Sequence, residues 1–314
     1  MALHPRILAI GSVYLDIILE VPYYPEEDSK LRSEHVEKRR GGNSPNTLVV
    51  LSQLFQKNGQ GSCHFMGSIA SLESKDNKVL LADLKEYSID LDCCLKTDKE
   101  DPPTSYIVAT TKGTRTIINH NPLPDVDLLH FKNNYPNHDF TWVHVEGRNI
   151  EAVSEILDYL IEESVQNKKA ITTSIEIERP ESLRPGITQL QDKADVVFYS
   201  KIFAQSCGFE EPQAFLKSRK EFCKPSVIAF CTWGSKGAAA YQPSRDLLLQ
   251  EEAYPLAQVV SSVGAGDTFN AGVIYALSMD FSLQDTLKFA CKLASLKCGR
   301  SDFSGLGQDM SEDL

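Results

Sequence analysis

One stretch near the C-terminal end of the chain combines small residues with a single carboxylate. It reads Val263-Gly264-Ala265-Gly266-Asp267-Thr268-Phe269-Asn270-Ala271. An apolar run over 256–260 precedes it and predicts a strand. Apolar residues at helical spacing follow it, so we expect a tight turn and then a helix with Asp267 in its first turn. The amides of such a turn lack intrahelical partners and favour an anion, which predicts a phosphate site.

Asp267 admits two interpretations. A bound phosphate repels a carboxylate, so an aspartate at this place makes sense if it accepts a proton while a phosphoryl group is transferred. The amides of Gly264, Ala265 and Gly266 would then stabilise the charge on that group. The alternative is an aspartate that only caps a helix after a flexible turn. The nonapeptide alone gives the two interpretations about equal weight.

Two more polar features occur in the first fifty residues. A first strand is expected over 6–19 and contains Asp16. A buried, unpaired aspartate is costly, so Asp16 is expected either to face a ligand cavity or to lie on the solvent side of the strand. Gly42, Asn43 and Asn46 precede an apolar run at helical spacing. Glycine lets the backbone approach a ligand and asparagine amides both donate and accept, although such residues are also ordinary in turns.

The elements that must position these residues alternate regularly from residue 140 on. Short apolar strands and amphipathic helices follow one another, which predicts an α/β fold with a Rossmann-like parallel sheet covered by helices on both faces. Ligands bind at the carboxyl ends of the strands in such folds. The expected strands span 63–69, 142–145, 170–177, 196–199 and 226–232, and the expected helices span 47–55, 78–87, 150–163, 212–222 and 282–299.

Two stretches stand outside this pattern. Residues 20–40 and 104–120 alternate polar and apolar side chains, which is typical of strands with one wet face. The second stretch reads as a hairpin around Lys112-Gly113. We expect the two to form a small separate sheet inserted into the larger one. Because no linker or repeat interrupts the chain, we expect residues 1–314 to form a single domain.

Charge and cysteine content argue against several functional classes. The chain has 32 Lys and Arg against 43 Asp and Glu, a net charge of −11, which argues against nucleic acid or an anionic membrane as partner. Its 8 cysteines show no C-x-x-C pair and no zinc spacing, which indicates free thiols in a reducing compartment. No cleavage site follows the apolar N-terminus, and no stretch is apolar enough to span a membrane. We therefore expect a cytoplasmic protein.

Several short motifs occur in a fixed order along the chain. Together they resemble the PfkB/ribokinase family of carbohydrate kinases over residues 6–305, and within it the ketohexokinase (fructokinase) branch. Each motif is weak alone, whereas their order and spacing are specific. The motifs are Leu15-Asp16, Tyr24-Pro25-x-Glu27-Asp28-Ser29, Gly41-Gly42-Asn43-x-x-Asn46, Phe65-Met66-Gly67-Ser68, Arg115-Thr116-Ile117, Leu123-Pro124-Asp125-Val126, His144-x-Glu146-Gly147-Arg148-Asn149, Gly264 to Ala271 and Lys297-Cys298-Gly299.

The resemblance implies a fold and an activity. The fold is a ribokinase-like domain with a β-sheet lid, often in a homodimer that clasps through the lids. The activity is transfer of the γ-phosphoryl group of ATP, with Mg²⁺, to a sugar hydroxyl, here the 1-hydroxyl of fructose or a related ketose. The alternatives are a kinase of the same family for another small alcohol, such as ribose or a nucleoside, and a weakly catalytic sugar-sensing protein on the same fold.

The resemblance also assigns roles to individual positions. Asp267 matches the catalytic base, and Gly264, Ala265 and Gly266 match the anion hole. Arg115 matches a lid cation near the nucleotide phosphates, although without the family it reads as a solvated strand arginine. The sugar-binding matches are Asp16, Gly42, Asn43 and Asn46, together with Asp28, which would reach the partner subunit's sugar. The nucleotide-binding matches are Gly234, Ser235, Lys236, Gly237, Phe269, Cys291, Ala294 and Cys298, of which the two cysteines read as core packing on their own.

The chain departs from the family pattern at three places. Ser261-Ser262 stands where the family usually has Asp-Thr, and because that Asp often helps to hold a monovalent cation, the departure puts potassium (K⁺) activation in question. Gly234-Ser235-Lys236-Gly237 stands where ketohexokinases carry acidic residues, which leaves nucleotide affinity and purine preference open. The N-x-x-E element of ribokinases is absent at 200–203, as it is in ketohexokinases. Four further charged residues cluster near expected strand ends: Glu146, Arg148, Glu176 and Glu178. A role in structural ion pairs has slightly more weight for them than a role in ligand binding.

Overall fold

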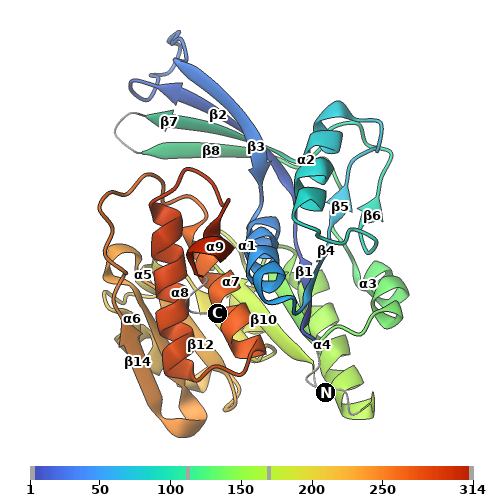
Figure 1. Ribbon diagram of the computed structural model, residues 1–314, viewed down its shortest axis with the longest axis vertical. Helices are drawn as coiled ribbons and strands as arrows, with labels where there is room; N and C mark the ends of the chain where they lie inside the picture. The colour runs from blue at the N-terminus through green and yellow to red at the C-terminus, as the bar shows by residue number, and fades with distance from the viewer. Residues whose placement is uncertain (1–3, 111–113, 168–170, 311–314) are drawn as a thin grey trace.

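A large sheet with helices on both faces forms the body of the molecule, and a smaller sheet projects from one end of it (Figure 1). The structure is a computed structural model that describes residues 4–110, 114–167 and 171–310. The Lys112-Gly113 turn and the first residue of the strand expected over 170–177 lie outside the described residues.

The large sheet confirms the expected α/β arrangement and adds an antiparallel edge. Its strand order is β14-β13-β12-β11-β10-β9-β1-β4, with parallel pairing from β4 to β12 and antiparallel pairing from β12 to β14. The sequence pattern did not predict β13 and β14, because a short turn and not an α-helix separates these two strands from each other. The strands are β1 (Arg6–Ile10), β4 (Ser62–Met66), β9 (Trp142–Glu146), β10 (Thr172–Ile177), β11 (Val196–Tyr199), β12 (Ile228–Thr232), β13 (Ala238–Gln242) and β14 (Leu247–Glu251).

Two hydrophobic cores flank this sheet, as alternation along β1 illustrates. Ile7 and Ala9 pack with α1, α2, α7, α8 and α9, whereas Leu8 and Ile10 pack with α3 to α6 on the opposite face. No helix in the described part of the chain has the length and hydrophobicity to cross a membrane. The helices are α1 (Asn43–Asn58), α2 (Lys75–Glu86), α3 (Leu128–Asn134), α4 (Ile150–Asn167), α5 (Lys201–Ser206), α6 (Pro212–Ser218), α7 (Ala265–Ser278), α8 (Leu283–Cys298) and α9 (Leu306–Asp309).

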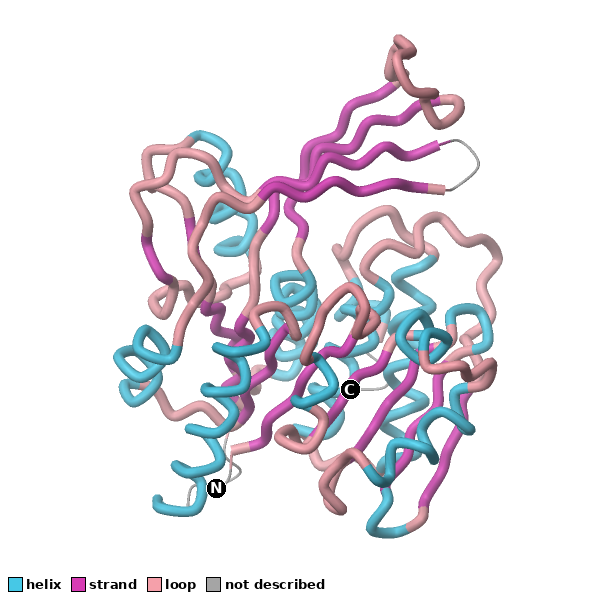
Figure 2. Tube along the Cα trace, turned by 180° about the vertical axis from the view of Figure 1, so that it is seen from behind, coloured by secondary structure: helices cyan, strands magenta, loops and turns pink. Residues whose placement is uncertain are grey.

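The smaller sheet, which we call the lid, has the strand order β3-β2-β7-β8. Figure 2 shows its strands leaving the body together as one curved layer. Its strands are β2 (Tyr14–Val21), β3 (His35–Gly41), β7 (Thr104–Thr110) and β8 (Arg115–His120), and a separate two-stranded sheet pairs β5 (Ser68–Ile69) with β6 (Leu95–Lys96).

The bounds of the lid differ from those expected. The single strand expected over 6–19 is two strands, because the chain leaves the body after Ile10 and enters the lid at Tyr14. Asp16 therefore belongs to the lid. Residues 22–34, expected within a strand region, contain no strand. The apolar pattern continues across the break at Gly11-Ser12, so hydrophobicity alone did not reveal it.

The strand expected over 256–260 is wrong. This segment bends at Ala257 and pairs in no sheet, and the Val260 and Ser261 amides both donate to the Cys298 carbonyl, at 2.8 and 3.1 Å. The side chains of Val259 and Val260 are 63% and 54% exposed, and both line the cleft described below. An apolar run that forms a cleft wall has the same sequence pattern as a buried strand.

Candidate active site

A cleft of about 870 Å³ lies between the lid and the carboxyl ends of the body strands. Because the strands from β4 to β12 are parallel, their carboxyl ends share one edge of the sheet, which is where such folds bind ligands. The lid contributes side chains from all four of its strands, among them Asp16, Arg39, Ser105 and Arg115, and the body contributes Asn43, Asn46, Glu176, Glu178, Asp267 and Phe269.

Asp267 lies in the first turn of α7, as expected. Gly264 precedes the helix as its N-cap with a left-handed φ of 74°. The Ala265 amide donates to the Ser262 carbonyl at 3.3 Å, and the intrahelical bonds begin with Thr268 donating to Gly264 at 2.9 Å. The amides of Gly266 and Asp267 precede the first intrahelical bond and have no acceptor within the helix. Both residues line the cleft, so these amides favour an anion there.

Burial makes the Asp267 carboxyl group a weaker acid than usual. Its side chain is 8% exposed, and burial raises its pKa to about 7, opposed by a hydrogen bond from Asn46 and assisted by the charges of Glu178 and Glu146. The Asn46 Nδ2 donates to Asp267 Oδ2 at 2.7 Å. A carboxylate with a pKa near neutrality, held beside a cleft, is suited to accept a proton from a substrate hydroxyl.

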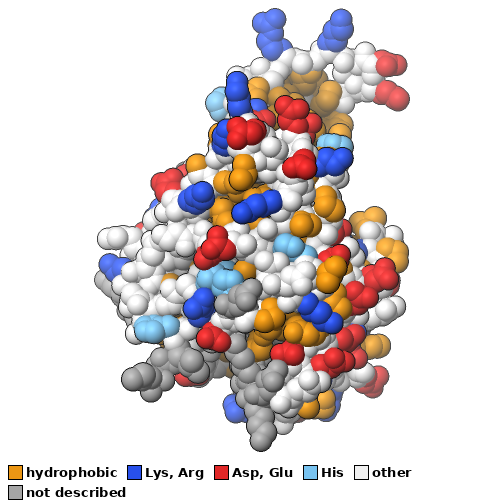
Figure 3. All heavy atoms as spheres, turned by 90° about the vertical axis from the view of Figure 1, so that its right-hand side faces the viewer, with side chains coloured by type: hydrophobic (Ala, Val, Ile, Leu, Met, Phe, Trp, Pro, Cys, Tyr) orange, Lys and Arg blue, Asp and Glu red, His pale blue; other side chains and the backbone are white. Residues whose placement is uncertain are grey.

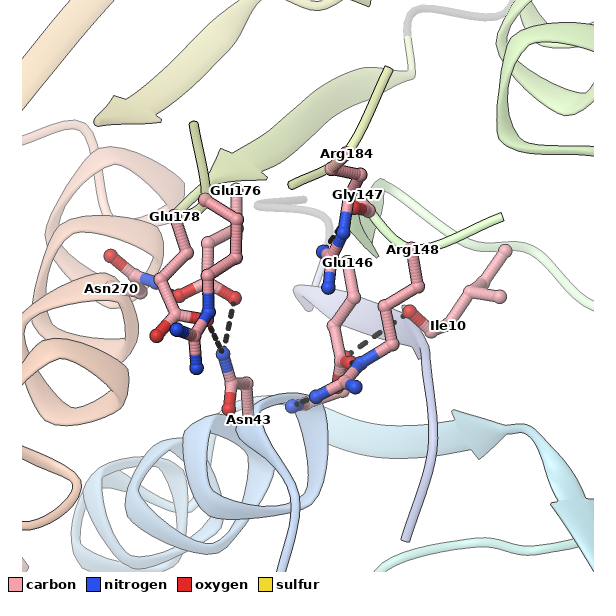
Figure 4. A network of polar contacts seen from close by, with 11 residues as sticks. Ile10, Asn43, Glu146, Gly147, Arg148, Glu176, Glu178, Arg184 and Asn270 are labelled. Carbon is pink, nitrogen blue, oxygen red and sulfur yellow. Dashed lines mark hydrogen bonds and ion pairs between the residues drawn. The ribbon is translucent and has the colours of Figure 1, made fainter. Parts of the chain in front are cut away.

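Two glutamates at the end of β10 extend the acidic floor of the cleft (Figure 4). Asn43, the first residue of α1, donates from Nδ2 to Glu176 at 3.0 Å and to Glu178 at 3.5 Å. Asn270 of α7 also donates to Glu176, at 3.3 Å. Burial, with the charges of Asp267 and Glu178, raises the pKa of Glu176 well above its usual value. These glutamates are thus part of the cleft surface as well as of a hydrogen-bond network.

Glu146 and Arg148 form the ion pair that sequence analysis favoured for this group. Glu146 is 4% exposed, and its carboxylate accepts from Arg148 and from the Ser44 amide, the latter at 2.7 Å. Figure 4 shows Glu146 and Arg148 side by side. Arg148 in turn lies over the Tyr14 ring at 5.3 Å. This pair joins the end of β9 to the start of α1 and so positions the asparagines of α1.

Asp16 lies on the cleft side of β2, which agrees with the cavity interpretation and not with the solvent one. Burial raises the pKa of its carboxyl group, opposed by a hydrogen bond with the Ser105 hydroxyl of β7. Gly41 lies beside it on β3, and a Cβ atom at Gly41 would overlap both carboxylate oxygens of Asp16. The Gly41-Gly42 pair therefore makes room for this carboxylate.

The remaining predicted residues divide into those that line the cleft and those that do not. Gly42, at the N-cap of α1, lines it, as does Arg115 at the start of β8. Asp28 lies exposed in the β2–β3 loop. Residues 234–236 form a 3-10 turn after β12, where Lys236 pairs with Glu211 at 3.3 Å. The predicted residues that lie outside the cleft lining are Asp28, Gly234, Ser235, Lys236, Gly237, Ala265, Cys291, Ala294 and Cys298.

Several residues of the site have no recognisable signal in the sequence. Arg40 is buried and bonded to Asn46, but in the sequence it reads as one more charge in a polar lid strand. Phe198, next to the last residue of β11, and Phe230, in the middle of β12, line the cleft although their apolar runs predicted only core packing. The order of the strands in the sheet, which brings these strands together, was the information that the sequence lacked.

Comparison with known proteins assigns the family. Residues 4–305 match the pfkB family of carbohydrate kinases. A ketohexokinase of Mus musculus is 37% identical over 305 residues, which cover 96% of this chain and 98% of that protein. A ribokinase of Arabidopsis thaliana is 23% identical over 93% of this chain and 76% of that protein.

Solved structures give the same fold. A ribokinase from Giardia lamblia has a TM-score of 0.81 at 15% identity, covering 99% of this chain and 98% of that one. A ribokinase from Cryptococcus neoformans var. grubii serotype A, in complex with ADP, has a TM-score of 0.76 at 20% identity, with 99% of both chains covered. The ribokinase-like fold is therefore confirmed, and the chain belongs to the pfkB family of carbohydrate kinases, as a sugar kinase of the ketohexokinase type.

Proposed function

We propose that the protein transfers the γ-phosphoryl group of ATP to the 1-hydroxyl of fructose or a related ketose. The observation that carries the proposal is the place of Asp267, a buried carboxylate in the first turn of α7, beside anion-binding amides and within the cleft under the lid. The similarity to a ketohexokinase over 98% of that protein supports the choice of sugar.

In this proposal the sugar lies between the lid and the start of α1. Asp16 would accept hydrogen bonds from sugar hydroxyls, and the Asn43 and Asn46 amides would donate and accept. The Gly42 backbone would allow close approach. A site that pairs each hydroxyl rejects analogues that lack one, because the unpaired polar groups are then left buried. The sugar must also displace the mutual contacts that these side chains make in its absence, such as Asn43 to Glu176.

Asp267 would accept the proton of the attacking hydroxyl. Such general-base assistance is typically worth ~10²–10⁴-fold in rate. Of the predicted anion hole, the amides of Gly264 and Gly266, which line the cleft, would stabilise charge on the transferred group together with the dipole of α7. The Ala265 amide already donates to the Ser262 carbonyl. The bond that forms joins the sugar oxygen to the γ-phosphorus, the bond that breaks releases ADP, and the proton passes to the Asp267 carboxylate.

The nucleotide would lie along the second half of the cleft. Phe269 lines it, and Arg115 on the lid can approach the phosphates. The turn 234–237 and the α8 residues Cys291, Ala294 and Cys298 would have to form the outer part of a base pocket. Mg²⁺ would arrive with the phosphates, because no group of three ligating side chains gathers for a metal among the described residues.

Potassium is not part of the proposal. Ser261-Ser262 lacks a carboxylate, and Lys297, 1% exposed, already places an ammonium against this segment. Its Nζ donates to the carbonyl oxygens of Ser261 and Arg300, both at 3.3 Å. We expect similar turnover in potassium and in choline salts.

The rest of the proposal concerns the molecule as a whole. We propose a single kinase domain over residues 1–314, paired through the lid with a second copy, with sugar and ATP as its small-molecule partners and no nucleic acid or membrane partner. The 8 cysteines are all free thiols, which supports a reducing compartment such as the cytoplasm.

Measurement of ADP release over a panel of acceptors tests this function. Fructose should give the highest kcat/KM, and ribose or a nucleoside should give a much lower value. A preference for ribose or a nucleoside would replace the ketose proposal with another alcohol kinase. Tight fructose binding without ADP release would instead indicate a sugar-sensing protein.

A further inference from the structure

A buried arginine at the base of the lid contacts two other elements of the site. Arg40, near the end of β3, is 9% exposed. Its Nη1 donates to the Asn46 Oδ1 at 2.6 Å, and its Nε donates to the Asp83 carboxylate of α2. The Phe303 ring lies 5.8 Å from the guanidinium carbon. A planar guanidinium held on three sides has one orientation, so its position is well defined.

The bond from Arg40 determines which end of the Asn46 amide faces the catalytic carboxylate. An amide has an accepting oxygen and a donating nitrogen, whereas a carboxylate only accepts. With its oxygen held by Arg40, Asn46 presents its NH₂ group to Asp267, and Nδ2 lies 2.7 Å from Oδ2. Without Arg40, the bond to Asp267 is the restraint that remains on this amide, so the Asn46 side chain is held less firmly.

We propose that Arg40 is a positioning residue for phosphoryl transfer, which orients the Asn46 amide and through it the Asp267 carboxylate. The connection runs from α2 through the last residues of the lid strand β3 to α1 and α7 in the body (Figure 1). The inference rests on the proposed role of Asp267 as base, and it gives Arg40 no contact with the substrate.

The charges that face Asp267 give the inference a second readout. Burial raises its pKa, and so do the charges of Glu178, just after β10, and Glu146, the last residue of β9, whereas Arg40 lowers it. The charge of Asp267 in turn raises the pKa of Glu176. Lys297 of α8 also interacts with Asp267. Removing the Arg40 charge should raise the pKa of Asp267 further. A base works only when it is deprotonated. The pH below which activity falls should therefore be higher in this variant than in the wild type.

Two substitutions at Arg40 separate geometry from charge. Arg40→Met should lower kcat by about tenfold to a hundredfold and move the acidic limb of kcat/KM up by about one pH unit. Arg40→Lys keeps the charge, but one ammonium cannot reproduce the fork that joins Asp83 to Asn46. It should therefore keep the limb near that of the wild type while kcat stays reduced.

Lys38→Met is the matched control. Lys38 lies on the same strand and bonds Asp76 of the same helix at 3.3 Å, but both side chains are about half exposed and neither touches Asn46. The control removes a contact between the lid and α2 and should leave kcat and the pH profile unchanged. Thermal melting checks that each variant is folded.

The outcomes distinguish this inference from the proposed function. If Asp267→Asn is inactive while Arg40→Met behaves like Lys38→Met, the positioning role of Arg40 is wrong and the base remains. If Asp267→Asn is active, the proposed function fails first. Should Arg40→Met not fold, Arg40→Lys decides, since a wild-type kcat in that variant would overturn the inference.

Discussion

At the scale of single residues, the proposed function assigns different side chains of the cleft to the sugar and to the nucleotide. The polar side chains proposed for the sugar come from β2 and the start of α1, whereas the cation and aromatic ring proposed for the nucleotide come from β8 and α7. Asp16 belongs to the proposed sugar side, where it hydrogen-bonds Ser105 inside the lid and lies beside Gly41.

Asp16→Ala should therefore affect the sugar and not the nucleotide. Loss of the carboxylate leaves sugar hydroxyls unpaired in a closed site, at a cost of about 2 kcal/mol, or roughly a 30-fold rise in the sugar KM. The ATP KM should stay unchanged. Gly41→Ala displaces the same carboxylate without removing it and should give the same pattern. A rise in the ATP KM alone would place Asp16 elsewhere.

The pH dependence follows from the environment of Asp267. Because its pKa is raised to about 7, the carboxyl group is protonated below that pH and deprotonated above it. A base is active when deprotonated, so kcat/KM should fall about tenfold per pH unit below pH 7 and level off above it. A flat profile from pH 5 to 8 would contradict the role of this group.

The sequence identified these residues better than it identified their partners. The short motifs pointed to Asp16, Asn43, Asn46 and Asp267, since the residue types themselves suggest the chemistry. The bond between Asn46 and Asp267, which are 221 positions apart in the sequence, could not be inferred, because no local pattern encodes such a contact. Arg40 was missed for the same reason.

At the scale of elements, the turn before α7 depends more on Gly264 than on Gly266. Gly264 has a left-handed φ of 74°, and a Cβ atom there would overlap the Phe303 ring. Gly266 follows inside the helix, and a Cβ atom there meets no atom within 4 Å. The two glycines therefore differ in what they tolerate, although they read alike in the sequence.

Gly264→Ala should destabilise the protein, and Gly266→Ala should not. The first substitution forces alanine into a left-handed conformation, at about 1–2 kcal/mol before any overlap is counted. The second places alanine in a helix, where it is favoured over glycine by up to about 1 kcal/mol. Thermal melting of the two variants measures the difference. Equal melting temperatures would show that the turn is not constrained in this way.

The sequence predicted most body elements but not the topology at their edges. Amphipathic helices such as α8, with its N-cap at Ser282, and buried strands such as β11 have clear periodicity and were found. The antiparallel pair β13 and β14 and the division between β1 and β2 were missed. In each case a turn of only a few residues separates two strands. The hydrophobicity of the sequence does not change enough across such a turn to reveal it.

At the scale of the whole molecule, the lid leaves apolar surface uncovered. Tyr106 and Ile118 pair across β7 and β8 on the face turned away from the cleft, and they are 47% and 63% exposed. Figure 3 shows hydrophobic atoms among the charged groups on one side of the molecule, the lid included. A small sheet with an exposed apolar face gains stability if a second copy covers that face, most simply by two-fold symmetry.

We therefore expect a homodimer that shares its sites through the lids. Asp28, in the β2–β3 loop, would then reach the partner's sugar. Heterodimers of an Asp267→Asn subunit with an Asp28→Ala subunit should regain activity, because one of their two composite sites is intact. Sedimentation must first show the dimer at the assay concentration. A monomer, or verified heterodimers without activity, would rule the arrangement out.

The most direct test of the account is the turnover of Asp267→Asn. Asparagine keeps the shape of the side chain but cannot accept the proton, so kcat should fall by at least a hundredfold. Fructose binding, measured by calorimetry, should remain within a few-fold of wild type. A variant that keeps more than about a tenth of the wild-type kcat would contradict the claim that Asp267 is the base of a sugar kinase.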